Sequence, residues 1–281
     1  MNVLDGVADL AVFPKGSSKW ELHSKFHQTF NLINKSNQQL LLVAPENQSV
    51  VPGGLFLQEK AFFELRLLVD TFESVVIEKQ TVRIETKNQV YVIHVHEGPS
   101  TRLNYEGQAL VCSNQVLHFL EGFSEVTGFD IALNQFIGNQ GIGLLQEQTK
   151  NTLNTKDDWI DFLMGRGRGL TPSGDDFLIG WTMVEQLYGS NELGQSIKKR
   201  LDQVLQQTTD ISQHYLRLAS KGYYGIDQLA LSDVLQKKTA VTSLPIVIKN
   251  ILSHGHTSGC DFLAGVVFGL SLRNKSYFRG K

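Results

Sequence analysis

The chain has 281 residues, of which 41% are hydrophobic and 19% charged, and its formal net charge is −2. This composition is typical of a globular protein and argues against nucleic acid or an anionic membrane as the main partner. The two cysteines, Cys112 and Cys260, stand in no metal-ligand spacing, which favours a reducing, cytoplasmic environment. No apolar run approaches the length of a membrane span, and the first residues carry no signal-like basic region.

Residues 1–100 are predicted to form a β-rich domain, a curved antiparallel sheet or partly closed barrel. Short apolar runs at 40–44 and 55–58 are separated by turn-forming residues. Residues 74–96 are rich in β-branched side chains, and residues 87–89 are predicted to form a turn within them. Residues 62–69 fit either a third strand or a short helix buried against the sheet.

The composition changes across residues 97–100, and helical spacing follows, so residues 101–281 are predicted to form a mainly helical domain. The glycine-rich run 138–143 is expected to be a flexible loop or a helix junction. The fold class is therefore α+β. The helices are predicted at 111–120, 159–164, 177–188, 193–207, 212–219, 227–236, 244–252 and 258–272.

Two related glycine-containing motifs stand out in the helical part. Residues 165–180 read GRGRGLTPSGDDFLIG, and residues 255–265 read GHTSGCDFLAG. With one gap for Pro172, both fit the pattern G-x-T-(P)-S-G-x-D-F-L-x-G, and each opens an apolar helix. No Gly-Lys-Ser/Thr follows the glycines, so the motif is not a Walker A loop and no nucleotide site is expected.

Helix capping explains part of both motifs without any function. Ser173 with Asp176, and Ser258 with Asp261, match the capping box in which a serine and a carboxylate satisfy each other's backbone amides. However, both motifs also place a glycine in the first helical turn, where it costs up to about 1 kcal/mol relative to alanine. Glycine is useful where a ligand or another backbone approaches closely, which favours a binding site over pure capping.

The expected ligand is a small anion. The amides of a helix entrance form an anion site, and the guanidinium groups of Arg166 and Arg168 can add bidentate donors. Residues 208–212 are best explained as a helix cap, with two of their hydroxyls as further candidates for the same pocket. The predicted anion-binding residues are Arg166, Gly167, Arg168, Gly169, Thr171, Ser173, Gly174, Thr257, Ser258, Gly259, Thr209 and Ser212.

The carboxylates Asp175, Asp176 and Asp261 are the predicted catalytic groups, together with His256. Carboxylates can accept hydrogen bonds from a substrate amide or hold a hard cation. No resident cofactor is expected, with Mg²⁺ on Asp175 and Asp176 as the alternative. His256 stands at the second helix entrance and titrates near neutrality, so it is a candidate proton donor or anion ligand.

Two other histidines, His94 and His96, lie two residues apart in the strand-rich region and so share one face. Such a pair can ligate a metal. A structural, hydrogen-bonded role without metal is the interpretation favoured here.

Residues 167–176, GRGLTPSGDD, resemble the AllH family, with 255–261 and 208–212 in supporting positions. The resemblance implies a subunit that acts beside two others in the oxamate carbamoyltransferase of purine (allantoin) breakdown. There, oxalurate and phosphate are interconverted with oxamate and carbamoyl phosphate, and a separate carbamate kinase recovers ATP. The resemblance transfers no catalytic residue. Cys260 replaces Asp175 in the second motif, so two sites related by a pseudo-twofold axis would not be equivalent.

Three functions therefore compete. The leading hypothesis is a carbamoyltransferase subunit that binds a small anionic substrate and works with other enzyme subunits. The second is a non-catalytic regulatory or scaffold subunit with an anion pocket. The third is a divalent-metal-dependent hydrolase, which needs a metal held by the aspartates.

Overall fold

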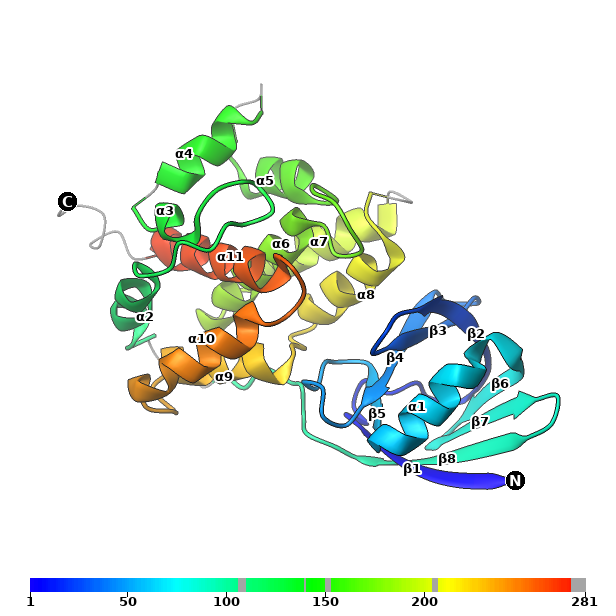
Figure 1. The fold of residues 1–281 in the computed structure, drawn as a ribbon. Helices are drawn as coiled ribbons and strands as arrows, with labels where there is room; N and C mark the ends of the chain where they lie inside the picture. The colour runs from blue at the N-terminus through cyan, green and yellow to red at the C-terminus, as the bar shows by residue number, and fades with distance from the viewer. Residues whose placement is uncertain (106–109, 139, 150–152, 204–206, 274–281) are drawn as a thin grey trace. The chain divides into compact units, whose positions relative to one another are not determined.

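The computed structural model describes residues 1–105, 110–138, 140–149, 153–203 and 207–273. The chain divides into two compact units, Met1–Arg102 and Leu103–Lys281. The first contains the strands and the second is helical, so the predicted α+β class is confirmed (Figure 1). Among the described residues, no helix combines the length and apolar character that crossing a membrane requires.

The first unit is a closed eight-stranded barrel, whereas the sequence predicted a sheet or partial barrel. Its strands follow the order β1-β5-β4-β3-β2-β6-β7-β8, and a parallel pairing of β1 with β8 closes it. The predicted strands at 40–44, 55–58 and 74–96 are confirmed. The strands are β1 (Asn2–Ala8), β2 (Ser17–Lys25), β3 (Phe30–Asn34), β4 (Gln39–Pro45), β5 (Gly54–Leu57), β6 (Phe72–Glu78), β7 (Thr81–Thr86) and β8 (Val90–Glu97).

Alternating burial explains why these segments form a barrel. On β7, Val82 and Ile84 are buried while Arg83 between them is exposed, which is the two-residue period of a strand with one apolar face. The ambiguous segment 62–69 is a helix, α1 (Glu59–Leu68), followed by a 3₁₀ turn, η1 (Val69–Thr71). The buried residues Phe62 and Leu65 are three positions apart. In a helix this spacing puts both side chains on one face, from which they enter the barrel core.

The second unit contains the predicted helices. Of the two alternatives for residues 138–143, the helix junction holds, because the run lies between α3 and α4 and its residues 140–143 open α4, whose Leu145 is buried in the core. The end of the predicted helix 193–207 includes residues 204–206, which lie outside the described residues. The helices are α2 (Ser113–Leu120), α3 (Leu133–Phe136), α4 (Gln140–Glu147), α5 (Lys156–Leu163), α6 (Ser173–Leu187), α7 (Glu192–Gln203), α8 (Asp210–Ala219), α9 (Ile226–Leu235), the 3₁₀ turn η2 (Val241–Ser243), α10 (Leu244–Leu252) and α11 (Ser258–Arg273).

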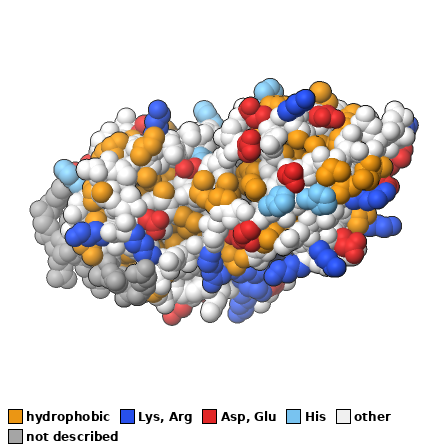
Figure 2. Space-filling model, turned by 90° about the horizontal axis from the view of Figure 1, so that it is seen from below, with side chains coloured by type: hydrophobic (Ala, Val, Ile, Leu, Met, Phe, Trp, Pro, Cys, Tyr) orange, Lys and Arg blue, Asp and Glu red, His pale blue; other side chains and the backbone are white. Residues whose placement is uncertain are grey.

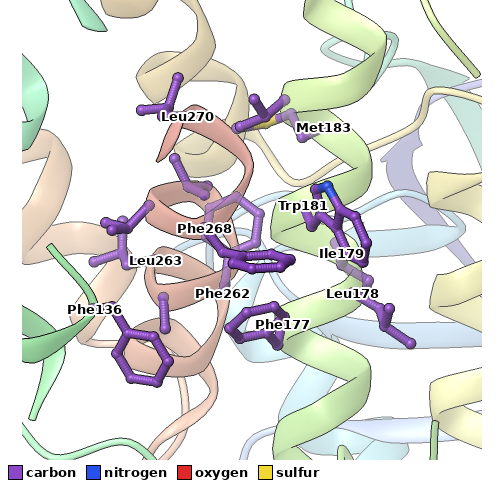
Figure 3. Packing of buried hydrophobic residues seen from close by; sticks show 14 of the residues in the cluster. Phe136, Phe177, Leu178, Ile179, Trp181, Met183, Phe262, Leu263, Phe268 and Leu270 are labelled. Carbon is purple, nitrogen blue, oxygen red and sulfur yellow. The ribbon is translucent and has the colours of Figure 1, made fainter. Parts of the chain in front are cut away.

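The two motif helices, α6 and α11, pack against each other at the centre of this unit (Figure 3). The Phe268 ring of α11 lies 5.4 Å from that of Phe177 and 4.9 Å from that of Trp181, both on α6. Such aromatic contacts add to the burial of apolar surface that stabilises the pair.

Two glycines allow the helices to approach closely, and they do so reciprocally. A Cβ placed on Gly180 would lie 2.1 Å from the carbonyl oxygen of Phe262, and one on Gly265 would lie 2.0 Å from that of Phe177. These four residues occupy equivalent positions in the two motifs. The two helices are therefore related by a pseudo-twofold axis through their crossing.

The surface carries charges of both signs. On the face drawn in Figure 2, Lys and Arg side chains and Asp and Glu side chains are interspersed with small groups of hydrophobic side chains. This distribution agrees with the small net charge of the sequence.

Candidate functional site

The two motif helices begin one residue earlier than the capping-box interpretation requires. The residue before α6 is Pro172, which makes no side-chain cap, and Ser173 is the first helical residue. Ser258 is likewise the first residue of α11. A capping-box serine must precede the helix, so that interpretation is wrong for both motifs. The carboxylates three residues later are therefore free for other contacts.

Close backbone contacts account for the first-turn glycines. A Cβ placed on Gly174 would lie 1.8 Å from the carbonyl oxygen of Leu163, and one on Gly259 would lie 2.0 Å from that of Ile251. The Gly174 amide donates to the Arg166 carbonyl at 2.8 Å, and the Gly259 amide donates to a carbonyl of the preceding turn. The sequence left open whether a ligand or another backbone approaches these glycines. The structure shows that it is another backbone, and both glycine amides already donate hydrogen bonds to carbonyl groups.

Asp175 anchors residues 165–172, which contain Arg166 and Arg168 and are called the arginine loop here, to the helix core. Its Oδ1 accepts a hydrogen bond from the Gly165 amide at 2.9 Å, and its Oδ2 accepts one from the Thr208 hydroxyl. The side chain is fully buried, and burial raises the pKa of Asp175 despite these bonds. In the second motif the equivalent residue is Cys260, whose pKa is raised to about 12 by burial. The two motifs are therefore chemically different at this position.

The other two carboxylates cross between the motif helices. Asp176, on α6, interacts with the hydroxyl of Ser258 on α11, and Asp261, on α11, interacts with the hydroxyl of Ser173 on α6. The Oδ1 of Asp261 also accepts from the Gly128 amide at 2.8 Å. These crossed contacts repeat the pseudo-twofold relation of the helices in a polar layer.

Burial and mutual repulsion perturb this layer. Burial raises the pKa of Asp176 well above its usual value, and the negative charges of Asp261 and Asp175 add to the rise. Burial also raises the pKa of Asp261. Nearby Tyr215 has its pKa raised to about 12, by burial first and by the charge of Asp176 second. The arrangement therefore favours protonated carboxyls over two ionised ones.

A pH dependence of stability follows from the raised pKa of Asp176. The folded state binds more protons than the unfolded state between the unfolded value, about 4, and the raised value, so stability falls as pH rises through this window. Asp176→Asn should reduce that fall, by about 1.4 kcal/mol for each pKa unit of the original shift. Urea unfolding at a series of pH values measures it. The exposed Asp202→Asn variant should keep the wild-type fall, and an unchanged slope in Asp176→Asn would contradict the assignment.

An open depression of about 1050 Å³ lies beside this layer. Seven of the predicted site residues border it, from the arginine loop, the start of α6 and the segment before α11. The lining residues are Val126, Thr127, Gly128, Phe129, Asp130, Gln148, Arg166, Gly167, Arg168, Gly169, Ser173, His256 and Thr257. Predicted residues that do not line it are Thr171, Gly174, Asp175, Asp176, Thr209, Ser212, Ser258, Gly259 and Asp261.

The two arginines of the loop differ in freedom. The guanidinium of Arg166 lies 4.3 Å from the centre of the Phe162 ring and donates to the Gln148 Oε1 at 3.2 Å, so it is held in place. Arg168 is exposed at the rim of the depression. Gly167, with a φ of 120°, adopts a backbone conformation that L side chains rarely enter, and this turn presents Arg168 outward. His256 is also exposed at the rim.

Sequence reasoning missed the segment 126–130, which forms one wall of the depression. A bridge between Val126 and Ala132 and a hydrogen bond from the Thr127 hydroxyl to the Ile131 carbonyl close a tight turn. Asp130 there has a φ of 61°. A Thr-Gly pair followed by an aspartate signals a turn, but no sequence feature connects that turn with the motifs.

The remaining polar candidates have structural contacts. Thr209 caps α8, its hydroxyl accepting from the Ser212 amide at 3.1 Å, so the capping interpretation of residues 208–212 is confirmed. His96 bonds Asp5 at 2.8 Å, while neighbouring His94 is exposed. Within the described residues, no three His, Cys, Asp or Glu side chains form a group that would hold a metal.

Comparison with known proteins agrees with the motif analysis. No solved structure matches the chain. The match to a family model begins just before the arginine loop and ends within α11, so it includes both motifs and the Thr208–Ser212 contacts between them. Residues 163–270 match the AllH family, described as oxamate carbamoyltransferase subunit AllH, which confirms the resemblance seen in the sequence.

Proposed function

We propose that this chain is a subunit of an oxamate carbamoyltransferase-like enzyme and that the depression beside Arg168 binds its small anionic substrate. Oxamate, oxalurate, carbamoyl phosphate and phosphate all carry carboxylate or phosphate oxygens. The observation that carries the proposal is the convergence of Arg166, Arg168 and the start of α6 on one open depression, within the matched segment. Planar guanidinium groups bind such oxygens in a bidentate manner.

The lining suits an anion bound at the surface of the unit. Arg166 is positioned by its contacts with Phe162 and Gln148, so it loses little freedom when it binds a ligand. Arg168 supplies an exposed second cation at the rim. Ser173 and Thr257 also border the depression, and their hydroxyls are further neutral polar groups there.

The reaction of oxalurate with phosphate requires that the site stabilise a developing negative charge and transfer one proton. When a phosphate oxygen attacks the carbamoyl carbon of oxalurate, the carbonyl oxygen gains charge, and the bond from that carbon to the oxamate nitrogen then breaks. The leaving nitrogen takes up one proton. Arg168 would stabilise the developing charge, and His256 at the rim would supply the proton.

Other subunits are the expected partners, because the matched family is described as one subunit of the enzyme. A cytoplasmic location would suit Cys112 and Cys260, which are both unpaired and buried. For the hydrolase alternative, Asp176 and Asp261 are the better-placed metal ligands, because each has an oxygen without a partner while both oxygens of Asp175 accept hydrogen bonds.

Titration of the purified chain with oxamate, carbamoyl phosphate and phosphate tests the binding proposal. Arg168→Ala should weaken binding about 10–100-fold, the value of one or two charge-assisted hydrogen bonds. The matched control is Arg83→Ala, which removes an exposed arginine from β7 of the barrel. Calorimetry should show control affinity equal to wild type. Equal affinity in Arg168→Ala for all three ligands would refute the arginine assignment.

A further inference from the structure

We propose that Asp176 and Asp261 form a binding site for a hard divalent cation between the N-termini of α6 and α11. Neither carboxylate lines the depression assigned to the anion, although Ser173 and Thr257 border both, so the cation site would adjoin the anion site. The inference does not depend on carbamoyl chemistry, because cation binding can be measured without any substrate.

The first argument is that each carboxylate has one buried oxygen with no partner. The Oδ2 atoms of Asp176 and Asp261 are both inaccessible to solvent and accept no hydrogen bond from the described residues. Asp261 as a whole is fully buried. Buried charged oxygens without partners are costly, so each needs a proton, a donor or a cation.

The second argument is that the two side chains lie close together. The starts of the two helices are in direct contact, because the Thr171 hydroxyl just before α6 lies 2.9 Å from that of Ser258, the first residue of α11, and Asp176 and Asp261 follow in the first turns of the two helices. Two ionised carboxylates carry a charge of −2, whereas each helix N-terminus contributes only about +0.5. About one negative charge remains uncompensated when both carboxyls are ionised, and this excess favours a bound cation.

The third argument is the chemistry of the surrounding atoms. The hydroxyls of Thr171 and Ser258 lie 2.9 Å apart beside Asp176, and those of Ser173 and Thr257 lie beside Asp261. All of these potential ligands are oxygens. Mg²⁺ prefers oxygen, is commonly bound through one or two carboxylates, and keeps several of its waters.

The contacts of Asp175 decide which carboxylates take part. The sequence alone pointed to Asp175 and Asp176 as the metal pair. Both oxygens of Asp175 already accept hydrogen bonds, from Gly165 and Thr208, whereas Asp176 and Asp261 each keep one buried oxygen without a partner. Asp261 takes its place because the pseudo-twofold packing brings the second motif alongside the first.

Mn²⁺ is a suitable probe, because it takes the same oxygen ligands as Mg²⁺ and its free form gives an electron paramagnetic resonance signal. Titrating the full chain with MnCl₂ should reveal a site from which excess Mg²⁺ displaces Mn²⁺. Asp176→Asn and Asp261→Asn should each weaken Mn²⁺ binding at least about tenfold, because each removes a charged ligand. Asp202→Asn, which removes an exposed carboxylate from α7, should bind as wild type.

Thermal melting shows whether the Asn variants are folded and gives a second measure of cation binding. In the absence of metal, both Asn variants should melt at or above the wild-type temperature, because each relieves the repulsion between the carboxylates. MgCl₂ should raise the melting temperature of wild type and of Asp202→Asn only. The proposal is overturned if wild type binds no Mn²⁺ at millimolar concentration, which would indicate a shared proton. It is also overturned if folded Asp176→Asn and Asp261→Asn both bind as wild type.

Discussion

Gly180→Ala should destabilise the helical unit by about 1–3 kcal/mol, although alanine favours a helix by up to about 1 kcal/mol over glycine. The reason is steric. The new Cβ would lie 2.1 Å from the Phe262 carbonyl oxygen, which belongs to helix backbone and cannot rotate away. The α6 and α11 axes must therefore separate, which loosens the aromatic contacts of Phe268.

The pseudo-twofold packing makes this prediction reciprocal. Gly265→Ala should cost a similar free energy, because its Cβ would lie 2.0 Å from the Phe177 carbonyl oxygen. Gly143→Ala is the matched control, since Gly143 is also helical but no atom outside its own helix turn lies within 4 Å of an added Cβ. This control should be neutral or slightly stabilising.

Urea unfolding followed by far-ultraviolet circular dichroism measures all three variants, because helices dominate that signal. Equal free energies of unfolding for Gly180→Ala and Gly143→Ala would contradict the close crossing of the two helices. A large loss for only one of Gly180→Ala and Gly265→Ala would contradict the reciprocal packing.

Much of the helical unit could be predicted from the sequence, because its helices carry apolar residues at helical spacing. Residues 244–252 are an example, with Val247, Ile248 and Ile251 all buried on one side. In the barrel, β2 was missed because its nine residues, SSKWELHSK, include only one that is fully buried, Trp20. Barrel closure depends on pairing β1 with β8, which are distant in sequence, and no local pattern encodes that contact.

The candidate site shows a different limit. The sequence drew attention to Gly174 correctly, since glycine there is costly without a reason. The sequence could not show whether a ligand or the Leu163 carbonyl occupies the space beside Gly174, because either one requires a residue without a Cβ. It also took Ser173 and Asp176 as partners in one helix. The structure pairs each motif's carboxylate with the other motif's serine, a contact that only the packing of α6 on α11 creates.

If the proposed function holds, Arg168→Ala should lower kcat/KM about 100-fold in an enzyme reconstituted from this chain and the proposed partner subunits, a typical cost of removing one donor that stabilises developing charge. Arg168 is exposed and lies in a loop that Asp175 anchors independently, so the variant should fold and assemble normally. Arg168→Lys should recover part of the loss, because lysine keeps the charge but not the bidentate geometry. A non-catalytic subunit would instead show equal rates in all variants.

Phosphate-dependent cleavage of oxalurate by the reconstituted enzyme, followed as carbamoyl phosphate formed, tests the central claim most directly. If the depression bordered by Arg166 and Arg168 binds the substrate, Arg168→Ala will lose about two orders of magnitude in kcat/KM while Arg83→Ala keeps the wild-type value. Equal values for Arg168→Ala, Arg83→Ala and wild type would show that this depression takes no part in the reaction.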